Sequence, residues 1–337
     1  MKLLITGGAG FIGSNLCEYF VQKGHEVVCL DNLSTGFRRN IEPFLGLPNF
    51  TFLEEDIRNL ETCRKAVKGC RVVLQEAALG SVPRSINDPI ATNSNNIDGF
   101  LNMLVAARDE GVERFVYAAS SSTYGDSKEL PKIEHNIGRP LSPYAITKFV
   151  NELYANVFSS LYGMETIGLR YFNVFGRRQD PNGAYAAVIP LWVKALIHHE
   201  SPFINGDGSY SRDFTYIDNV IQANELAATL PKEEIVKRSA LYNMNLPANA
   251  PLDMVFNVAF GGNTTLLDLF ECLRENLAKF DSEIATINPT FRENRAGDIP
   301  HSQASILKAQ KVLGYNPKYD ARLGFAEACE WYWRNIR

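Results

Sequence analysis

The stretch "LLITGGAGFIGSNL", residues 3–16, decides the fold. An apolar run enters a glycine turn and continues as a helical pattern, with Gly7, Gly10 and Gly13 between the two. This spacing gives a tight turn, lets the backbone approach a pyrophosphate and brings the helix close to the strand. A glycine triplet alone is a weak signal, because a structural glycine-rich turn also produces it.

Asp31 strengthens the interpretation of that turn as a dinucleotide site. It ends the next apolar run, 18 residues after Gly13, where a carboxylate can accept a hydrogen bond from a ribose 2′-hydroxyl. Its negative charge repels a 2′-phosphate, so the sequence predicts NAD rather than NADP. Asp56 closes the third apolar run, where either an adenine contact or a strand-end turn explains it.

Short apolar runs alternate with helical patterns through the first half of the chain. This alternation predicts an α/β fold with a doubly wound parallel sheet, covered by helices on both faces. We expect strands at residues 2–6, 26–31, 50–56, 71–78, 114–120 and 165–170, and helices at residues 11–23, 90–110 and 143–162.

The pattern changes near residue 176, where a polar, turn-rich segment begins. We therefore expect a dinucleotide-binding domain at 1–176 and a smaller α/β substrate-binding lobe at 177–337, with segments around 212–230 and 255–262 returning to the first domain. Within the second part, the residues after 185 read as a helix. Residues 201–219 read as a hairpin that leads into another helix, and residues 231–256 as an insertion loop.

Composition excludes some classes of partner. The 337 residues carry a formal net charge of -4, which argues against nucleic acid or an anionic membrane as the main partner but allows an anionic substrate. The six cysteines show no CxxC and no metal spacing, so buried reduced thiols and no metal are expected. The amino terminus is a poor signal peptide and no apolar stretch reaches membrane length, which together predict a cytoplasmic protein.

A Tyr-x-x-x-Lys spacing occurs three times, beginning at Tyr19, Tyr124 and Tyr144. Spacing alone is a chance event in a chain of this size, so the surroundings decide. Tyr19 lies within the first helix, and Tyr124 is followed directly by a turn. In "SPYAITK", Ser142 can cap a helix and the following proline fits its first position, which puts Tyr144 and Lys148 on one helical face.

The chemistry expected of this pair is base catalysis. A free tyrosine has a pKa near 10, and lowering it by roughly three units takes about 4 kcal/mol, which a nearby ammonium and a nicotinamide cation can supply. Tyr144 would then remove a hydroxyl proton while hydride leaves the same carbon for NAD. Lys148 would hold the phenolate and the nicotinamide ribose, and Ser120 would relay or orient the proton. The competing interpretation is a pair of surface helix residues.

These features together resemble the extended short-chain dehydrogenase/reductase family, within the NAD-dependent epimerases and dehydratases. The likeness covers nearly the whole chain through "GGAGFIG", "DNLSTG", "SSSTYGD", "SPYAITK", "RYFNVFG", "RDFTYIDN" and "NRAGDIP". "LGSVPRSINDP" and "FNVFGRRQDPNGAYAAVIP" are most similar to 4-epimerases of UDP-N-acetylglucosamine. The resemblance implies a Rossmann domain with bound NAD, a UDP-sugar substrate, a 4-keto intermediate and a homodimer formed through the helices at 90–110 and 143–162.

The resemblance also implies two sets of site residues. Those expected at the cofactor are Gly7, Gly10, Phe11, Ile12, Gly13, Asp31, Asn32, Ser34, Thr35, Gly36, Asp56, Ile57, Gln75, Ala77, Ala78, Asn96, Tyr144, Lys148, Tyr171 and Val174. Those expected at the substrate are Ser81, Arg84, Ser121, Ser122, Asn173, Ala187, Val188, Phe203, Ile204, Asn205, Arg212, Arg295, Asp298 and Ser302, with Arg212 and Arg295 as clamps on the diphosphate.

Ser302 bears on the substrate. In relatives restricted to non-acetylated sugars, a tyrosine stands seven residues after the arginine that matches Arg295, and here that place holds Ser302. A small residue leaves room for a 2-acetamido group. One departure from the family concerns the cofactor, because Gln75 stands where the relatives have histidine.

Other functions stay open at this point. The chain could be a 4-epimerase of UDP-glucose, or of a UDP-hexuronic acid whose carboxylate meets Arg84. A 4,6-dehydratase needs an acid and a base after the active-site hydroxyl, and Ser121 and Ser122 supply neither. A non-catalytic NAD-sensing protein on the same fold would not need Tyr144 and Lys148 together.

Overall fold

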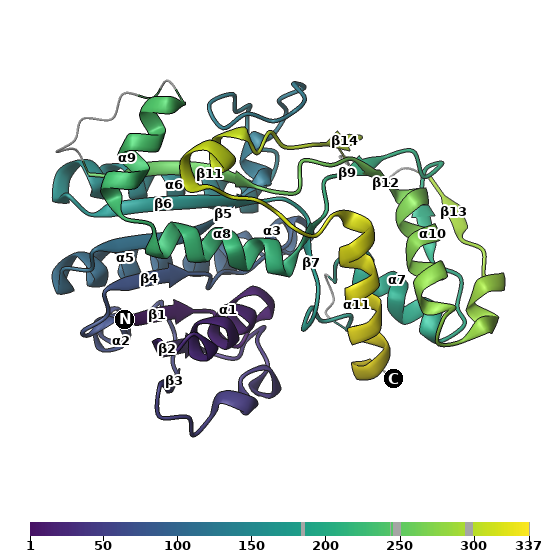
Figure 1. The fold of residues 1–337 in the computed structure, drawn as a ribbon, viewed down its shortest axis with the longest axis horizontal. Coiled ribbons are helices and arrows are strands. Elements are labelled where there is room, and N and C mark those ends of the chain that lie inside the picture. Colours follow the sequence, from purple (N-terminus) through teal and green to yellow (C-terminus); the bar gives the residue numbers. More distant parts are fainter. Residues whose placement is uncertain (183–185, 243, 245–250, 294–298, 337) are drawn as a thin grey trace.

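One parallel sheet of seven strands organises the structure, a computed structural model that describes residues 1–182, 186–242, 244, 251–293 and 299–336 (Figure 1). The strand order is β11-β6-β5-β4-β1-β2-β3, and every neighbouring pair is parallel. The strands are β1 (Lys2–Thr6), β2 (Glu26–Asp31), β3 (Phe50–Glu54), β4 (Val72–Gln75), β5 (Arg114–Ser120), β6 (Glu165–Tyr171) and β11 (Asp253–Val258). The six predicted strands are all present, and the doubly wound α/β fold is confirmed.

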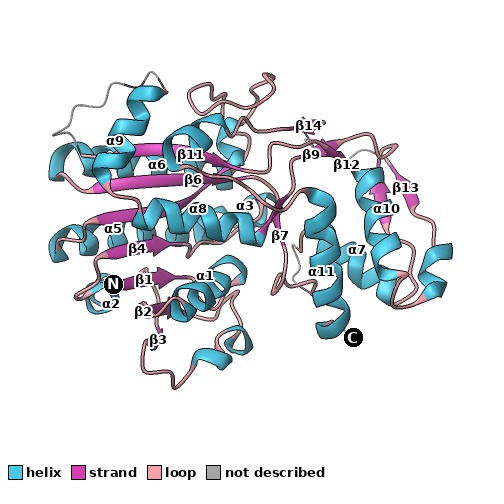
Figure 2. Ribbon diagram, viewed as in Figure 1, coloured by secondary structure: helices cyan, strands magenta, loops and turns pink. Residues whose placement is uncertain are grey.

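Helices cover both faces of the sheet (Figure 2). Helices α1 (Phe11–Gln22) and α8 (Ile217–Thr229) pack on one face, while α2 (Leu60–Val67), α5 (Gly99–Glu110) and α6 (Pro143–Tyr162) pack on the other. Side chains alternate along the strands, so Leu3 and Ile5 enter the first core and Leu4 enters the second. Both faces are apolar, which explains why the strands read as continuous apolar runs.

The helix predicted over residues 90–110 is not continuous. It divides into α4 (Pro89–Asn93), a π-helical stretch η3 (Ser94–Asp98) and α5. Asn95 of the π-helical stretch lines the cavity described below, consistent with the tendency of such stretches to occur at functional sites.

The insertion loop expected over residues 231–256 is wrong. Helix α9 (Lys232–Leu241) begins this segment, and β11 near its end supplies the seventh strand of the sheet. The strand escaped sequence reasoning because polar residues interrupt its apolar pattern. Asp253 Oδ1 accepts a 3.0 Å bond from Thr166, and the buried Asn257 accepts a 2.7 Å bond from the Tyr124 hydroxyl.

The smaller lobe combines helices with very short strands. Helices α7 (Val188–Ile197), α10 (Leu266–Leu277) and α11 (Ala321–Asn335) form its bulk (Figure 1). Its strands pair as β8 (Phe203–Asn205) with β13 (Thr290–Arg292), β9 (Ser211–Arg212) with β12 (Thr264–Thr265) and β14 (His301–Ser302), and β7 (Val174–Phe175) with β10 (Thr215–Tyr216). The remaining short helices are α3 (Val82–Asn87), η1 (Arg38–Asn40), η2 (Glu42–Phe44), η4 (Ser121–Tyr124), η5 (Ser282–Thr286) and η6 (Ala309–Leu313).

The hairpin predicted over residues 201–219 is also wrong. The "NGDG" turn is present, but the strands on either side of it pair with segments far along the chain rather than with each other. Turn residues favour a reversal of the chain but do not choose the partner strand. Helix α8 does follow this segment, as expected, and it lies against the main sheet although it comes after residue 176. The proposed domain boundaries stay a prediction.

Three further observations concern the described part of the chain. All six cysteines are buried free thiols, as predicted. No group of three or more histidine, cysteine or acidic side chains there is arranged to hold a metal ion. None of the helices described combines the length and apolar character needed to cross a bilayer.

Candidate active site

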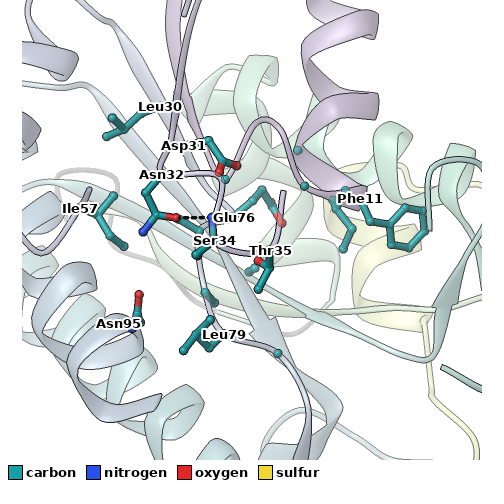
Figure 3. A pocket seen from close by; sticks show the side chains of 18 of the residues that line it. Phe11, Leu30, Asp31, Asn32, Ser34, Thr35, Ile57, Glu76, Leu79 and Asn95 are labelled. Carbon is teal, nitrogen blue, oxygen red and sulfur yellow. Dashed lines mark hydrogen bonds between the residues drawn. The ribbon is translucent and has the colours of Figure 1, made fainter. Parts of the chain in front are cut away.

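A cavity of about 390 Å³ lies at the carboxyl ends of β1 and β4, where the strand order of the sheet reverses direction. Ligands of doubly wound sheets bind at this switch point. Figure 3 shows Asp31 and Asn32 on one side of the cavity, with Leu79 and Asn95 opposite. The predicted residues that line it are Gly7, Gly10, Phe11, Ile12, Gly13, Asp31, Asn32, Ser34, Thr35, Ile57, Ala77, Ala78, Ser120, Tyr144, Lys148 and Tyr171.

The glycine turn forms one end of this cavity. Gly7 has φ +65°, and a β-carbon on Gly13 would lie 2.1 Å from the Gly7 carbonyl oxygen, so neither position tolerates a side chain. Helix α1 begins at the next residue after Gly10, and no side chain caps it. Its first N–H groups therefore stay available to an anion at the positive end of the helix dipole.

Asp31 is nine-tenths buried at the end of β2. Its two carboxyl oxygens accept bonds from the backbone N–H groups of Ala9 (2.9 Å) and Leu33 (2.8 Å). Burial raises the pKa of Asp31, while these backbone donors act in the opposite direction. The same contacts fix the carboxyl group beside the glycine turn, where the sequence places a ribose contact.

Two predicted cofactor residues support the cavity from behind its wall. Asp56 pairs with Arg58 at 2.7 Å and accepts a 2.8 Å bond from Asn32, which does line the cavity. The hydrogen bond from Arg58 holds the pKa of Asp56 at about 2. Gly36 packs tightly on the Ala9 backbone, since a β-carbon there would lie 2.8 Å from the Ala9 carbonyl carbon.

Three more predicted cofactor residues lie outside the cavity lining. Gln75 is buried and accepts a 2.8 Å bond from Thr6, so it links two strands. Asn96, in the π-helical stretch, accepts from the backbone N–H of Leu79 (2.8 Å) and thereby holds the loop that does line the cavity. Val174 lies in β7, paired with β10.

The predicted catalytic residues meet at the other end of the cavity. Ser142 caps helix α6 through a 3.1 Å bond from the Ala145 N–H, and this start places Tyr144 and Lys148 one turn apart. Lys148 Nζ is buried and donates to the Ala118 carbonyl at 2.8 Å. Burial lowers the pKa of Lys148 to about 8.

Ser120 orients Tyr144. Its Oγ accepts bonds from the N–H (3.1 Å) and the hydroxyl (2.9 Å) of Ser122, so its own proton is left for Tyr144. Burial raises the pKa of Tyr144, and the hydrogen bond with Ser120 acts against this. In the protein without a bound cofactor, the pKa of Tyr144 is therefore raised and not lowered, contrary to what the sequence led us to expect.

The two other Tyr-x-x-x-Lys matches have structural explanations. The Tyr124 hydroxyl is buried and donates to Asn257 at 2.7 Å. Lys23 lies over the ring of Tyr19, 5.3 Å from its centre. Neither tyrosine lines the cavity.

Sequence reasoning missed several residues of the cavity wall. These are Leu30, Glu55, Glu76, Leu79, Gly80, Asn95, Ala118 and Ala119. All of them except Ala118 are direct sequence neighbours of predicted residues, so extending the prediction by one residue at those places would have found them. Glu76 is the important omission, since it follows Gln75 at the end of β4 and places a carboxyl group among the catalytic residues. Burial raises its pKa to about 7.

The predicted substrate residues lie around the neighbouring edge of the smaller lobe and on loops after the strands. Ser121 and Ser122 begin η4, and Ser81 caps α3, which carries Arg84. Asn173 has φ +37° and donates to the Asp213 carbonyl at 3.1 Å.

Within the smaller lobe, Arg212 and Ser302 are direct neighbours across β9 and β14. Arg212 donates to the backbone carbonyl of Pro300 at 3.1 Å. The other predicted residues here are Ala187 and Val188 at the start of α7, and Phe203, Ile204 and Asn205 in β8, where the Ile204 side chain is fully buried. Arg295 and Asp298 lie outside the described residues.

The side chains and backbone of the cavity fit NAD. The uncapped start of α1 suits a pyrophosphate, the fixed Asp31 carboxyl suits a ribose diol, and the Tyr144–Lys148 pair suits the reacting nicotinamide end. A 2′-phosphate would meet the carboxylate of Asp31 at close range.

Comparison with known proteins identifies the family. The NAD-dependent epimerase/dehydratase family matches residues 3–244. A UDP-glucose 4-epimerase of Mycolicibacterium smegmatis is 32% identical over 334 residues, 98% of each chain. A Thermotoga maritima UDP-glucose 4-epimerase with UDP-glucose has a TM-score of 0.87 and 32% identity and covers both chains fully. A UDP-N-acetylglucosamine 4-epimerase of Methanobrevibacter ruminantium, in complex with UDP-N-acetylmuramic acid, has a TM-score of 0.86 and 34% identity, covering 99% of this chain and 98% of that one. The chain therefore belongs to the NAD-dependent epimerase/dehydratase family, with NAD as its cofactor.

Proposed function

We propose that the chain interconverts UDP-N-acetylglucosamine and UDP-N-acetylgalactosamine by inverting C4 through a 4-keto sugar. At the coarser level, the chain is an NAD-dependent nucleotide-sugar 4-epimerase, in keeping with its family and its relatives. The meeting of Tyr144, Lys148 and Ser120 at one end of the dinucleotide cavity carries the catalytic part of the proposal.

Bound NAD supplies a hydride acceptor that later returns the hydride. Tyr144 Oη takes the proton of the C4 hydroxyl while the C4 hydride leaves, and gives that proton back when the hydride returns. Ser120 holds the phenol in place by its hydrogen bond. Lys148 lines the same cavity one turn along α6, and we assign it to hold the phenolate and the nicotinamide ribose. Proton and hydride both return to the sugar, so the reaction is an isomerisation without net oxidation.

Inversion requires the keto sugar to present its other face to the cofactor. A site that holds the UDP part firmly and the sugar part loosely allows this turn. We assign the firm part to Arg212 for the diphosphate and to the segment around Phe203 for the uracil, since both lie in the smaller lobe on short strands that follow each other along the chain.

Ser302 supports the acetylated substrate. In β14 it lies directly beside Arg212, so its side chain borders the proposed diphosphate clamp. A tyrosine at this place would fill the space that a 2-acetamido group needs. The relatives named for UDP-glucose keep the non-acetylated sugar as the second candidate.

The test is to incubate purified protein with UDP-N-acetylglucosamine, UDP-glucose and their uronic forms, and to follow inversion at C4 by NMR. We expect conversion of the acetylated sugar. Brisk turnover of UDP-glucose without conversion of UDP-N-acetylglucosamine would reject the substrate assignment.

A matched pair of variants sharpens that assay. Ser302→Tyr should lose turnover of the acetylated sugar and keep turnover of UDP-glucose, because only the 2-acetamido group meets the new ring. Ser302→Ala removes the hydroxyl without adding volume and should keep both activities.

We also propose a homodimer. An apolar stripe with Ile146, Leu153, Val157 and Leu161 is 46–69% exposed along one side of α6, and Ile90 of the adjoining α4 is 81% exposed. A two-fold pairing of α6 with its copy would bury this stripe against itself. Light scattering at micromolar concentration should give twice the chain mass, and a monomer would contradict the proposal.

A further inference from the structure

Glu76 is an acidic side chain at the catalytic end of the cavity, and the proposed reaction assigns it no role. It follows the last residue of β4 and lines the cavity, as Figure 3 shows. Tyr144, Lys148 and Tyr171 line the same cavity. Glu76 is half-buried there, and acidic side chains in such positions usually have a partner or a function.

Two hydrogen bonds fix the carboxyl group. Asn224 Nδ2 donates to the Tyr171 hydroxyl at 2.9 Å, and the Tyr171 hydroxyl lies 2.8 Å from Glu76 Oε1. Because the amide donates to the phenol oxygen, the phenol proton points to the carboxyl group. Glu76 therefore accepts from Tyr171 and can do so whether it is charged or neutral, since Oε1 keeps a lone pair in both forms.

The ionisable groups that face Glu76 come from two elements. Tyr171 belongs to β6, while Tyr144 and Lys148 belong to α6. Burial raises the pKa of Glu76 to about 7, with the hydrogen bond from Tyr171 and the charge of Lys148 acting against this. The charge of Glu76 in turn contributes to the raised pKa of Tyr144, after burial itself.

We propose that Glu76 is a positioning residue that sets the charge balance of the Tyr144–Lys148 pair, and thereby the pH at which the base becomes active. A charged Glu76 favours the ammonium of Lys148 and opposes the phenolate of Tyr144. A neutral Glu76 removes that opposition. This inference rests on the proposed role of Tyr144 as the base.

The closing experiment titrates Tyr144 directly by tyrosinate absorbance near 295 nm in the NAD-containing protein. The chain has 14 tyrosines, so the signal of Tyr144 is taken as the difference between each protein and the same protein carrying Tyr144→Phe. Glu76→Gln is the test variant, because its amide oxygen can still accept from Tyr171 while its charge is lost. Glu61→Gln, the same chemical change at an exposed position on α2, is the matched control.

We expect Glu76→Gln to move the Tyr144 midpoint to lower pH by about one unit, and Glu61→Gln to leave it in place. The acid limb of the pH dependence of kcat/KM should move in the same direction. An unchanged midpoint, or a shift to higher pH, overturns the inference. This readout is independent of turnover, so absence of epimerase activity would reject the proposed function while the titration still decides the role of Glu76.

Discussion

Helix α6 carries two buried ionisable side chains one turn apart, and they have opposite surroundings. Glu152 binds Arg170 through two bonds of 2.9 and 2.7 Å, and Arg170 also donates to the Glu134 carbonyl at 2.8 Å. Lys148 donates to one backbone carbonyl, and its charge faces a cavity. The charge of Glu152 is thus paired within the chain, whereas the charge of Lys148 is available to a ligand.

The same contrast appears on the neighbouring strand. Arg170 and Tyr171 are consecutive residues of β6, so they point to opposite faces. Arg170 pairs with Glu152 on one face, and Tyr171 donates to Glu76 at the cavity on the other. A buried charge therefore does not by itself indicate a ligand-binding site. It indicates one when the charged side chain has no counter-charge within the chain.

The largest effect is expected from removing the Tyr144 hydroxyl at the cavity. Tyr144→Phe should lower kcat by about 100- to 10,000-fold, because the phenyl ring cannot exchange a proton with the C4 hydroxyl. The NMR assay of C4 inversion measures this. The thermal unfolding temperature of the Tyr144→Phe variant should change little, since the hydroxyl serves chemistry rather than packing. Turnover close to that of the unchanged protein would remove Tyr144 from the mechanism.

The second largest effect is expected from breaking the buried ion pair between Glu152 and Arg170. Glu152→Gln leaves the buried Arg170 without a counter-charge and should lower the free energy of unfolding by about 3–5 kcal/mol. Urea unfolding measures the loss. Glu330→Gln, which breaks an exposed pair with Arg334 on α11, is the control and should cost little. Equal losses in the two variants would show that the Arg170 pair is not special.

A third prediction compares the pH dependence of stability. Because the folded-state pKa of Glu76 is raised from 4.5 to about 7, folding binds a proton between these values, and stability falls as pH rises through this window. Relative to Glu76→Gln, the unchanged protein should lose about 3 kcal/mol from pH 4.5 to 7, an upper bound because part of the carboxyl faces the cavity. Urea unfolding at several pH values, after removal of bound dinucleotide, measures the difference. A difference that stays constant across this range would contradict the raised pKa.

The smallest effect is expected at Tyr124, the tyrosine of another Tyr-x-x-x-Lys match. Tyr124→Phe removes a buried 2.7 Å bond to Asn257 and should cost about 1–2 kcal/mol of stability without changing kcat. Thermal unfolding and the NMR assay together check this. A large loss of turnover with an intact fold would return Tyr124 to the list of candidate bases.

The sequence predicted the dinucleotide half of the molecule well because its signals are local. The glycine turn and the helix start at Ser142 depend on neighbours within a few residues, and Asp31 lies only 18 residues after Gly13. The structure brings the glycine turn, Asp31 and Tyr144 of that helix to one cavity. Apolar strands buried on both faces are also easy to recognise, and β1, β2 and β5 have the predicted bounds.

The smaller lobe was harder because its order depends on distant partners. Strands of two or three residues carry almost no periodicity, and β9 pairs with segments more than 50 residues away. Polar residues hid β11 in the same way. Glu76 was missed for a different reason, since its importance comes from Tyr171, which lies 95 residues further along the chain.

The late position of β11 has a consequence for how the protein is made. Six strands and five of their covering helices precede it, yet β6 has no neighbour on that side until residue 258 has been synthesised. During translation β6 therefore presents an open edge to other nascent chains. Fragments that stop before β11 should consequently aggregate or recruit chaperones, even though they contain the whole glycine turn and the Tyr144–Lys148 pair.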